Sequence, residues 1–402
     1  MKQTSNLPAQ DKLTIGVLYG FRALMVLIVC HYHIWQQSWL SQYFVAFGSL
    51  VNLDALARSG YMFVDGMLLM SGFLLYLPYA RESVEGIPAP STRKFYRNRV
   101  ARIVPSYLLA VLLALVLVAI PQAVYRHMGT SFMVKDLFTH FTFTFNLFSD
   151  TLLRTPLNGV LWTVAVEVQF YLIFPFLARS MQKKPGTTLS LMALVGVCSR
   201  LLIVIFAKDT APLINQMPTF LDVYALGMLG ALLYVQYQKI AATVGRKALF
   251  LKISPWLGAV VFALAIFGVA SLLQIQASKT THEAIRQSQM ALRLPFALVM
   301  LWAMLSAAIM PRFLQKLLDN RLLRFLSTIS FNLYIWHQLL SVQIKHAFFD
   351  AGLQASRNQQ IVYTLLCFGV SILVAMAVTY GVEHPCSRLI KSLSNKGKEA
   401  EK

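Results

Sequence analysis

Ten apolar runs, each long enough to cross a lipid bilayer, are the feature that most constrains how this 402-residue chain can fold. A membrane-spanning helix needs about 20 mainly apolar residues, because the bilayer core offers no water to backbone N–H and C=O groups. The chain is 57% hydrophobic and only 13% charged, a balance that no soluble domain requires. We therefore predict an all-α, polytopic integral membrane protein. Its ten transmembrane helices are expected at residues 14–35, 60–79, 104–124, 157–177, 187–207, 218–236, 254–275, 294–310, 325–345 and 359–382.

The basic residues predict how these helices are oriented. Segments expected on one side of the membrane hold 24 Lys and Arg, and those on the other side hold 9. The richer side contains both ends of the chain, so the positive-inside rule places both termini in the cytoplasm. The first run carries Arg22 and lacks a small-residue cleavage site, which favours a retained helix over a signal peptide. The expected organisation is a cytoplasmic N-tail (1–13), a transmembrane domain (14–390) and a cytoplasmic C-tail (391–402), with both polar tails disordered.

Three further features limit which partners and sites this membrane protein is expected to have. The net charge of +20 follows mainly from this topology and from attraction to anionic lipid headgroups, and no basic patch with interleaved aromatics predicts a nucleic-acid partner. The stretch 140–148 is amphipathic, so it is expected either to lie in the membrane interface or to fold over the mouth of the bundle. The four cysteines have no paired spacing, which predicts neither a disulfide framework nor a metal site.

Arg22 and His33 are ionisable residues inside the first apolar run. Such a residue costs about 2.5–3.5 kcal/mol in a spanning helix and is usually retained for a function. At about 100° per residue their separation of eleven positions places them on one helix face, and at about 1.5 Å per residue roughly 16 Å apart. Arg22 is expected in the cytoplasmic half and His33 near the outer mouth. The alternative is a helix-packing arginine and a core histidine with satisfied hydrogen bonds.

Two carboxylates are predicted close to this face. Asp65 enters the second run at a depth similar to that of His33, where it would orient the imidazole; a water-facing aspartate at a helix start is the alternative. Glu167 falls near the middle of the fourth run, where a carboxylate needs a partner or a proton, and Arg22 is the obvious partner. The neighbouring Ser71-Gly72 pair predicts close helix approach rather than a nucleophile.

Polar residues in other runs can line the same bundle interior. Arg99 and Arg102 would share one face of a helix, and guanidinium pairs suit bidentate recognition of phosphate. Topology and attraction to lipid headgroups explain these two arginines less well, because they abut the next membrane segment. His337 lies in the outer half of the ninth run, and Glu383 lies at the inner end of the tenth.

These motifs, taken in order, resemble the acyltransferase 3 family of integral membrane acyltransferases over nearly the whole chain. The family's motifs correspond here to Arg22 followed after ten residues by His33, Val64-Asp65 with Ser71-Gly72-Phe73, Arg99 with Arg102, Trp162 through Tyr171, Ser330 through His337, and Glu383 with Pro385. Tyr19 stands where the family has an aspartate, and His31 is an additional histidine that faces elsewhere on the helix.

The resemblance implies an O-acyltransferase of the plasma (bacterial inner) membrane. It would move an acyl group, most often acetyl, from cytoplasmic acyl-CoA to a hydroxyl of a carbohydrate or glycolipid, either directly or through an acyl-His33 intermediate. His33 is then the general base, with Arg22, Asp65 and Glu167 as further catalytic residues. The implied substrate- and donor-binding residues are Arg99, Arg102, Trp162, Tyr171, Tyr334, His337 and Glu383. Acyl-CoA is a co-substrate, no permanently bound cofactor or metal is implied, and a homo-oligomer is left open.

Two rival classes compete with this interpretation. A proton-coupled exporter or flippase could use Arg22, His33, Glu167 and His337 as a relay, and it would accumulate substrate without covalent change. A purely structural membrane subunit is disfavoured by the number of ionisable residues inside the membrane.

Overall fold

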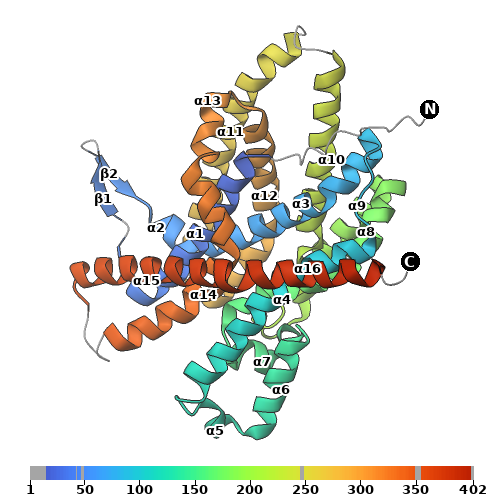
Figure 1. The fold of residues 1–402 in the computed structure, drawn as a ribbon. Helices are drawn as coiled ribbons and strands as arrows, with labels where there is room; N and C mark the ends of the chain where they lie inside the picture. Colours follow the sequence, from blue (N-terminus) through green and yellow to red (C-terminus); the bar gives the residue numbers. More distant parts are fainter. Residues whose placement is uncertain (1–14, 42, 47–48, 245–248, 349–354, 400–402) are drawn as a thin grey trace.

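The computed structural model describes residues 15–41, 43–46, 49–244, 249–348 and 355–399, which are almost entirely helical (Figure 1). The α-helices are α1 (Val17–Ser38), α2 (Asp54–Ser59), α3 (Phe63–Glu85), α4 (Thr92–Ala114), α5 (Val124–Met128), α6 (Thr130–Phe141), α7 (Ser149–Arg154), α8 (Trp162–Lys183), α9 (Pro185–Phe206), α10 (Leu221–Val244), α11 (Leu249–Ala277), α12 (His282–Ile309), α13 (Arg312–Leu318), α14 (Arg321–Phe348), α15 (Arg357–Val378) and α16 (His384–Glu399). One short antiparallel hairpin, β1 (Tyr43–Ala46) with β2 (Ser49–Asn52), was not predicted.

Nine helical stretches of the described chain are long and apolar enough to cross a membrane. They coincide with nine of the ten predicted runs and confirm the all-helical membrane architecture. The run predicted at 325–345 folds within α14, which has 28 residues but does not belong to these nine. Polar residues lower the hydropathy of α14. Five of them are buried in the structure: Ser327, Ser330, Asn332, His337 and Ser341.

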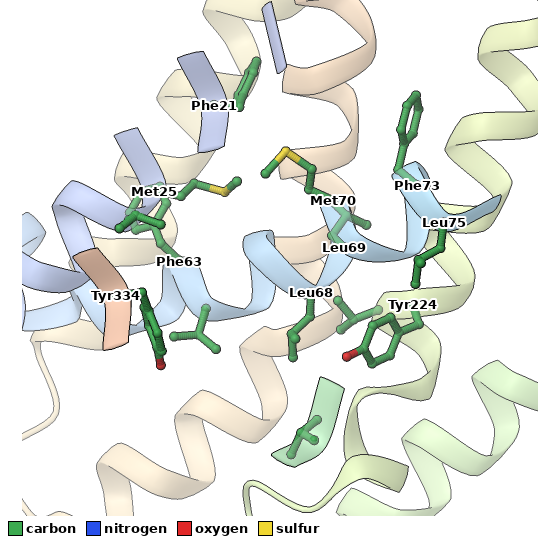
Figure 2. Packing of buried hydrophobic residues seen from close by; sticks show 14 of the residues in the cluster. Phe21, Met25, Phe63, Leu68, Leu69, Met70, Phe73, Leu75, Tyr224 and Tyr334 are labelled. Atoms are coloured by element: carbon green, nitrogen blue, oxygen red, sulfur yellow. The ribbon is translucent and has the colours of Figure 1, made fainter. Parts of the chain in front are cut away.

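Helix α3 lies at the centre of the bundle and packs against α1, α8, α10 and α12. Its contact with α10 is the closest of these because glycines face backbone from both sides. A Cβ on Gly72 would lie 2.6 Å from the Tyr224 carbonyl oxygen, and one on Gly227 would collide with the Leu69 carbonyl oxygen. The close helix approach predicted from Ser71-Gly72 is therefore confirmed. Figure 2 shows the apolar side chains that fill the space between α1, α3, α10 and α14.

Helix α1 carries the two ionisable residues that the sequence singled out, and it packs against α14 as well as α3. Its N-terminal part meets the end of α13, where a Cβ on Gly20 would collide with the Leu318 carbonyl oxygen. Farther along, Cys30 and Ile34 are fully buried. This packing fixes the rotation of α1, and so the direction in which its polar face points.

Helices α5 to α7 form a small cap that projects at the bottom of Figure 1. The stretch 140–148 belongs to this cap and is tied to the bundle by hydrogen bonds. The Tyr107 hydroxyl donates to the His140 carbonyl at 3.0 Å, and Gln169 donates to the Phe143 carbonyl at 3.0 Å and to Asn146 Oδ1 at 2.8 Å. These bonds attach the stretch to α4 and α8.

The chain ends in a long helical rod that crosses the front of Figure 1. Helix α15 continues through a π-helical turn, η6 (Thr379–Glu383), into α16, which packs against α4. The prediction of disorder for 391–402 is therefore wrong for residues 391–399. The polar C-tail continues a helix that α15 has already nucleated, so it adds one hydrogen bond for each residue that it orders.

Candidate functional site

A cavity of about 110 Å³ opens between α1, α3, α4, α8 and α14. This volume holds several water molecules or a small polar group. Its polar lining contains six of the residues predicted to be functional, together with Ser71, Thr163 and Ser330; the six are Arg22, Arg99, Arg102, Glu167, Tyr171 and Tyr334. The remaining walls are apolar and include Val26, Leu68, Met70 and Ile103.

The cavity contains three guanidinium groups and one carboxylate. Glu167 Oε1 accepts a hydrogen bond from Ser71 Oγ at 2.7 Å. The ion pairs found in the described part of the chain do not join Glu167 to Arg22, so the predicted pairing of these two residues is not formed. Ser71 on α3 donates a hydrogen bond to the Glu167 carboxylate instead. Arg22 remains a cation that lines the cavity.

Arg99 shows most clearly that the cavity is suited to an anion. Its guanidinium carbon lies 5.7 Å from the centroid of the Phe95 ring and 5.5 Å from that of Tyr171, which is cation–π geometry. Its buried Nε has no hydrogen-bond partner within the described structure. A buried ionised group needs a partner of opposite charge. The arrangement therefore favours an anionic ligand next to Arg99.

His33 and His337 form a direct pair, although they are 304 residues apart in sequence. His33 Nδ1 lies 2.9 Å from His337 Nε2 and 3.1 Å from the Val29 carbonyl oxygen. His337 is fully buried, and its Nδ1 lies 2.6 Å from the Tyr334 carbonyl oxygen. Tyr334 itself lines the cavity, so the histidine pair adjoins the arginine-lined space through α14.

Asp65 has a different partner from the one predicted. Its carboxylate is buried and lies 3.3 Å from Nε of Arg293 on α12, a side chain that is also fully buried. The Arg293 guanidinium stacks over the Phe220 ring at 3.8 Å. The predicted contact between Asp65 and His33 is therefore not formed. Arg293 neutralises Asp65 within the bundle, and residues so far apart in sequence could not be paired from one sequence alone.

The last two predicted residues lie outside the cavity lining. Trp162 stacks on Phe220 with ring centroids 6.1 Å apart, beside the Asp65–Arg293 pair. Glu383 ends the π-helical turn η6, where Asn332 donates to it at 2.7 Å. Glu383 is also within electrostatic range of Arg102, so it lies near the arginine side of the site.

Sequence reasoning missed two polar residues as parts of this site. Ser71 was assigned only to helix packing, yet it holds Glu167. Asn332 was not singled out, yet its amide also donates to Thr379 Oγ1 at 2.8 Å and so joins α14 to η6. The sequence contained a signal for each of these two residues, because a hydroxyl or amide inside an apolar run needs a hydrogen-bond partner.

A comparison with protein-family models matches residues 18–380 to the acyltransferase 3 model, described as an acyltransferase domain. No curated protein and no solved structure matched the chain. The matched region contains the arginine-lined cavity and the histidine pair, and Glu383 lies just beyond it. With most of its length matched, the chain belongs to the acyltransferase 3 family and is a membrane-bound acyltransferase.

Proposed function

We propose that this acyltransferase transfers an acyl group, most often acetyl, from acyl-CoA to a hydroxyl of a carbohydrate or glycolipid. The observation that carries the proposal is the placement of two groups on one helix. Helix α1 presents Arg22 to an anion-suited cavity and, three turns farther along, holds His33 against a second histidine. A donor held at the cavity and an acceptor held at His33 would meet along this helix.

The donor side of the proposal rests on charge. Arg22, Arg99 and Arg102 outnumber the single carboxylate of Glu167 in the cavity, which leaves an excess of positive charge. Guanidinium groups bind phosphate through paired N–H donors, and acyl-CoA presents phosphates at the end opposite its thioester. Binding of the phosphates at these arginines would leave the thioester arm free to extend along α1 towards His33.

The acceptor side requires a base. His33 takes the proton of the acceptor hydroxyl while the acceptor oxygen forms a bond to the thioester carbonyl carbon. The C–S bond then breaks, the acyl group stays on the acceptor oxygen, and the CoA sulfur receives the proton. A variant of this path, in which His33 first carries the acyl group, uses the same residues.

The proposal is tested by following the acetyl group in membranes that contain the protein. With radiolabelled acetyl-CoA, we expect label to appear in an envelope glycan or glycolipid only when the protein is present, and free CoA to be released in equal amount. Mass spectrometry of envelope glycans from cells with and without the gene would identify the acceptor. Movement of a glycan across the membrane without acylation would contradict the proposal and favour an exporter or flippase.

A further inference from the structure

The contacts of His33 and His337 determine where the protons of both rings lie. Carbonyl oxygens only accept hydrogen bonds, so the Tyr334 carbonyl requires a proton on Nδ1 of His337. The Val29 carbonyl requires one on Nδ1 of His33 for the same reason. A neutral His337 then has a lone pair on Nε2, which accepts the Nδ1–H of His33 at 2.9 Å. That N–H is shared between Val29 and His337, and the lone pair of His33 is left on its Nε2.

Other placements of the ring protons turn an acceptor towards an acceptor or a donor towards a donor. With its proton on Nε2, His33 would turn an Nδ1 lone pair towards the Val29 carbonyl oxygen at 3.1 Å. With protons on both nitrogens, His337 would turn its Nε2–H towards the Nδ1–H of His33. Among the assignments in which both rings are neutral, protonation of each ring on Nδ1 is the one in which every contact pairs a donor with an acceptor.

We propose that His337 is a positioning residue that holds His33 in its Nδ1–H tautomer, so that Nε2 of His33 is the atom that accepts the acceptor's proton. The inference rests on the proposed function and replaces Asp65, now paired with Arg293, as the group that orients His33. His33 is half-buried, and its Nε2 has no hydrogen-bond partner in the described structure. His337 is fully buried and acts through His33 rather than on substrate.

A neutral partner suits this position inside a membrane bundle. A carboxylate behind the base would bring a charge that needs its own counter-ion, whereas imidazole brings none. As the acceptor oxygen bonds to the thioester carbon, its proton moves to Nε2 of His33. The Nδ1–H bond to His337 then becomes charge-assisted and stabilises the imidazolium. The proton leaves with the CoA sulfur when the C–S bond breaks, which restores the neutral pair.

Two substitutions of similar size separate hydrogen bonding from packing. His337→Gln keeps an acceptor oxygen within reach of His33 Nδ1, whereas His337→Leu fills the space without one. Activity is followed in proteoliposomes with radiolabelled acetyl-CoA and an envelope glycolipid extract. We expect His337→Leu to lower kcat roughly 10²-fold with an unchanged KM for acetyl-CoA, and His337→Gln to stay within a few-fold of the wild type. Equal losses in both variants, or an unchanged kcat in His337→Leu, would overturn the proposal.

A spectroscopic measurement tests the tautomer without any substrate. Nitrogen NMR of ¹⁵N-histidine-labelled full-length protein in bilayers distinguishes protonated from unprotonated ring nitrogens, and His33→Ala identifies the His33 signals. We expect a protonated Nδ1 and an unprotonated Nε2 for His33. The opposite pattern would overturn the proposal even if His337→Leu failed to fold. A His33→Ala variant that still transferred acetyl would instead contradict the proposed function, while the tautomer assignment would stand.

Discussion

Among the basic residues of α4, Arg99 lines the cavity and Arg93 does not. Both belong to the same helix, and Arg93 is exposed. Hydrogen bonds to charged groups contribute about 1.5–3 kcal/mol, so Arg99→Gln should weaken acetyl-CoA binding at least roughly 10-fold. Arg93→Gln is the matched control and should bind acetyl-CoA like the wild type. Equal affinities of the two variants in a calorimetric titration would argue against a donor role for the cavity.

Asp65 allows a test of whether a residue of the family-like motif stabilises the fold or takes part in catalysis. Removing one member of a buried ion pair costs about 3–5 kcal/mol, because the other charge is left without a partner. Asp65→Asn should therefore lower the thermal unfolding temperature strongly, while the folded fraction keeps its kcat. The double variant Asp65→Leu with Arg293→Met should recover much of the lost stability. A stable Asp65→Asn protein with lost activity would restore the catalytic role that the sequence suggested.

At the scale of elements, the contact between α3 and α10 depends on small residues. A methyl group on Gly227 would collide with the Leu69 carbonyl oxygen, which is a backbone atom and cannot move independently of α3. Gly227→Ala should destabilise the protein by about 1–3 kcal/mol or more, measured as a lower unfolding temperature in detergent. Gly369→Ala is the control, since an added Cβ at Gly369 in α15 would meet no atom within 4 Å apart from the neighbouring backbone of its own helix. Similar unfolding temperatures for both variants would contradict the packing described for α3 and α10.

The sequence predicted elements and cavity residues better than it predicted partners. Apolar runs located nine of the spanning helices because the bilayer imposes their length and composition. Periodicity placed Arg99 and Arg102 on one helix face, and the structure puts both in the cavity. Pairings such as Asp65–Arg293, Ser71–Glu167 and His33–His337 depend on how distant helices rotate and meet. One sequence contains no signal for those rotations, so these partners could not be predicted.

At the scale of the whole molecule, the path of α14 decides whether the chain crosses the membrane an odd or an even number of times. A polar helix can span a bilayer if the polar side chains of its middle part are buried in the bundle, as Asn332 and His337 of α14 are. We therefore expect α14 to cross. In a cysteine-free background, Arg312→Cys and Asn358→Cys should react with a membrane-impermeant maleimide from opposite sides, the first only after permeabilisation. Labelling of both from the same side of intact cells would contradict the ten-helix topology with two cytoplasmic termini.

We propose that helix α1 separates two tasks, with donor binding at the arginines and proton transfer at His33. The most direct test measures acetyl-CoA binding and acetyl transfer side by side for the purified wild type and His33→Ala in proteoliposomes. We predict that His33→Ala binds acetyl-CoA with wild-type affinity but loses at least about 10²-fold in transfer rate. A folded His33→Ala protein that transfers acetyl at the wild-type rate would contradict the account.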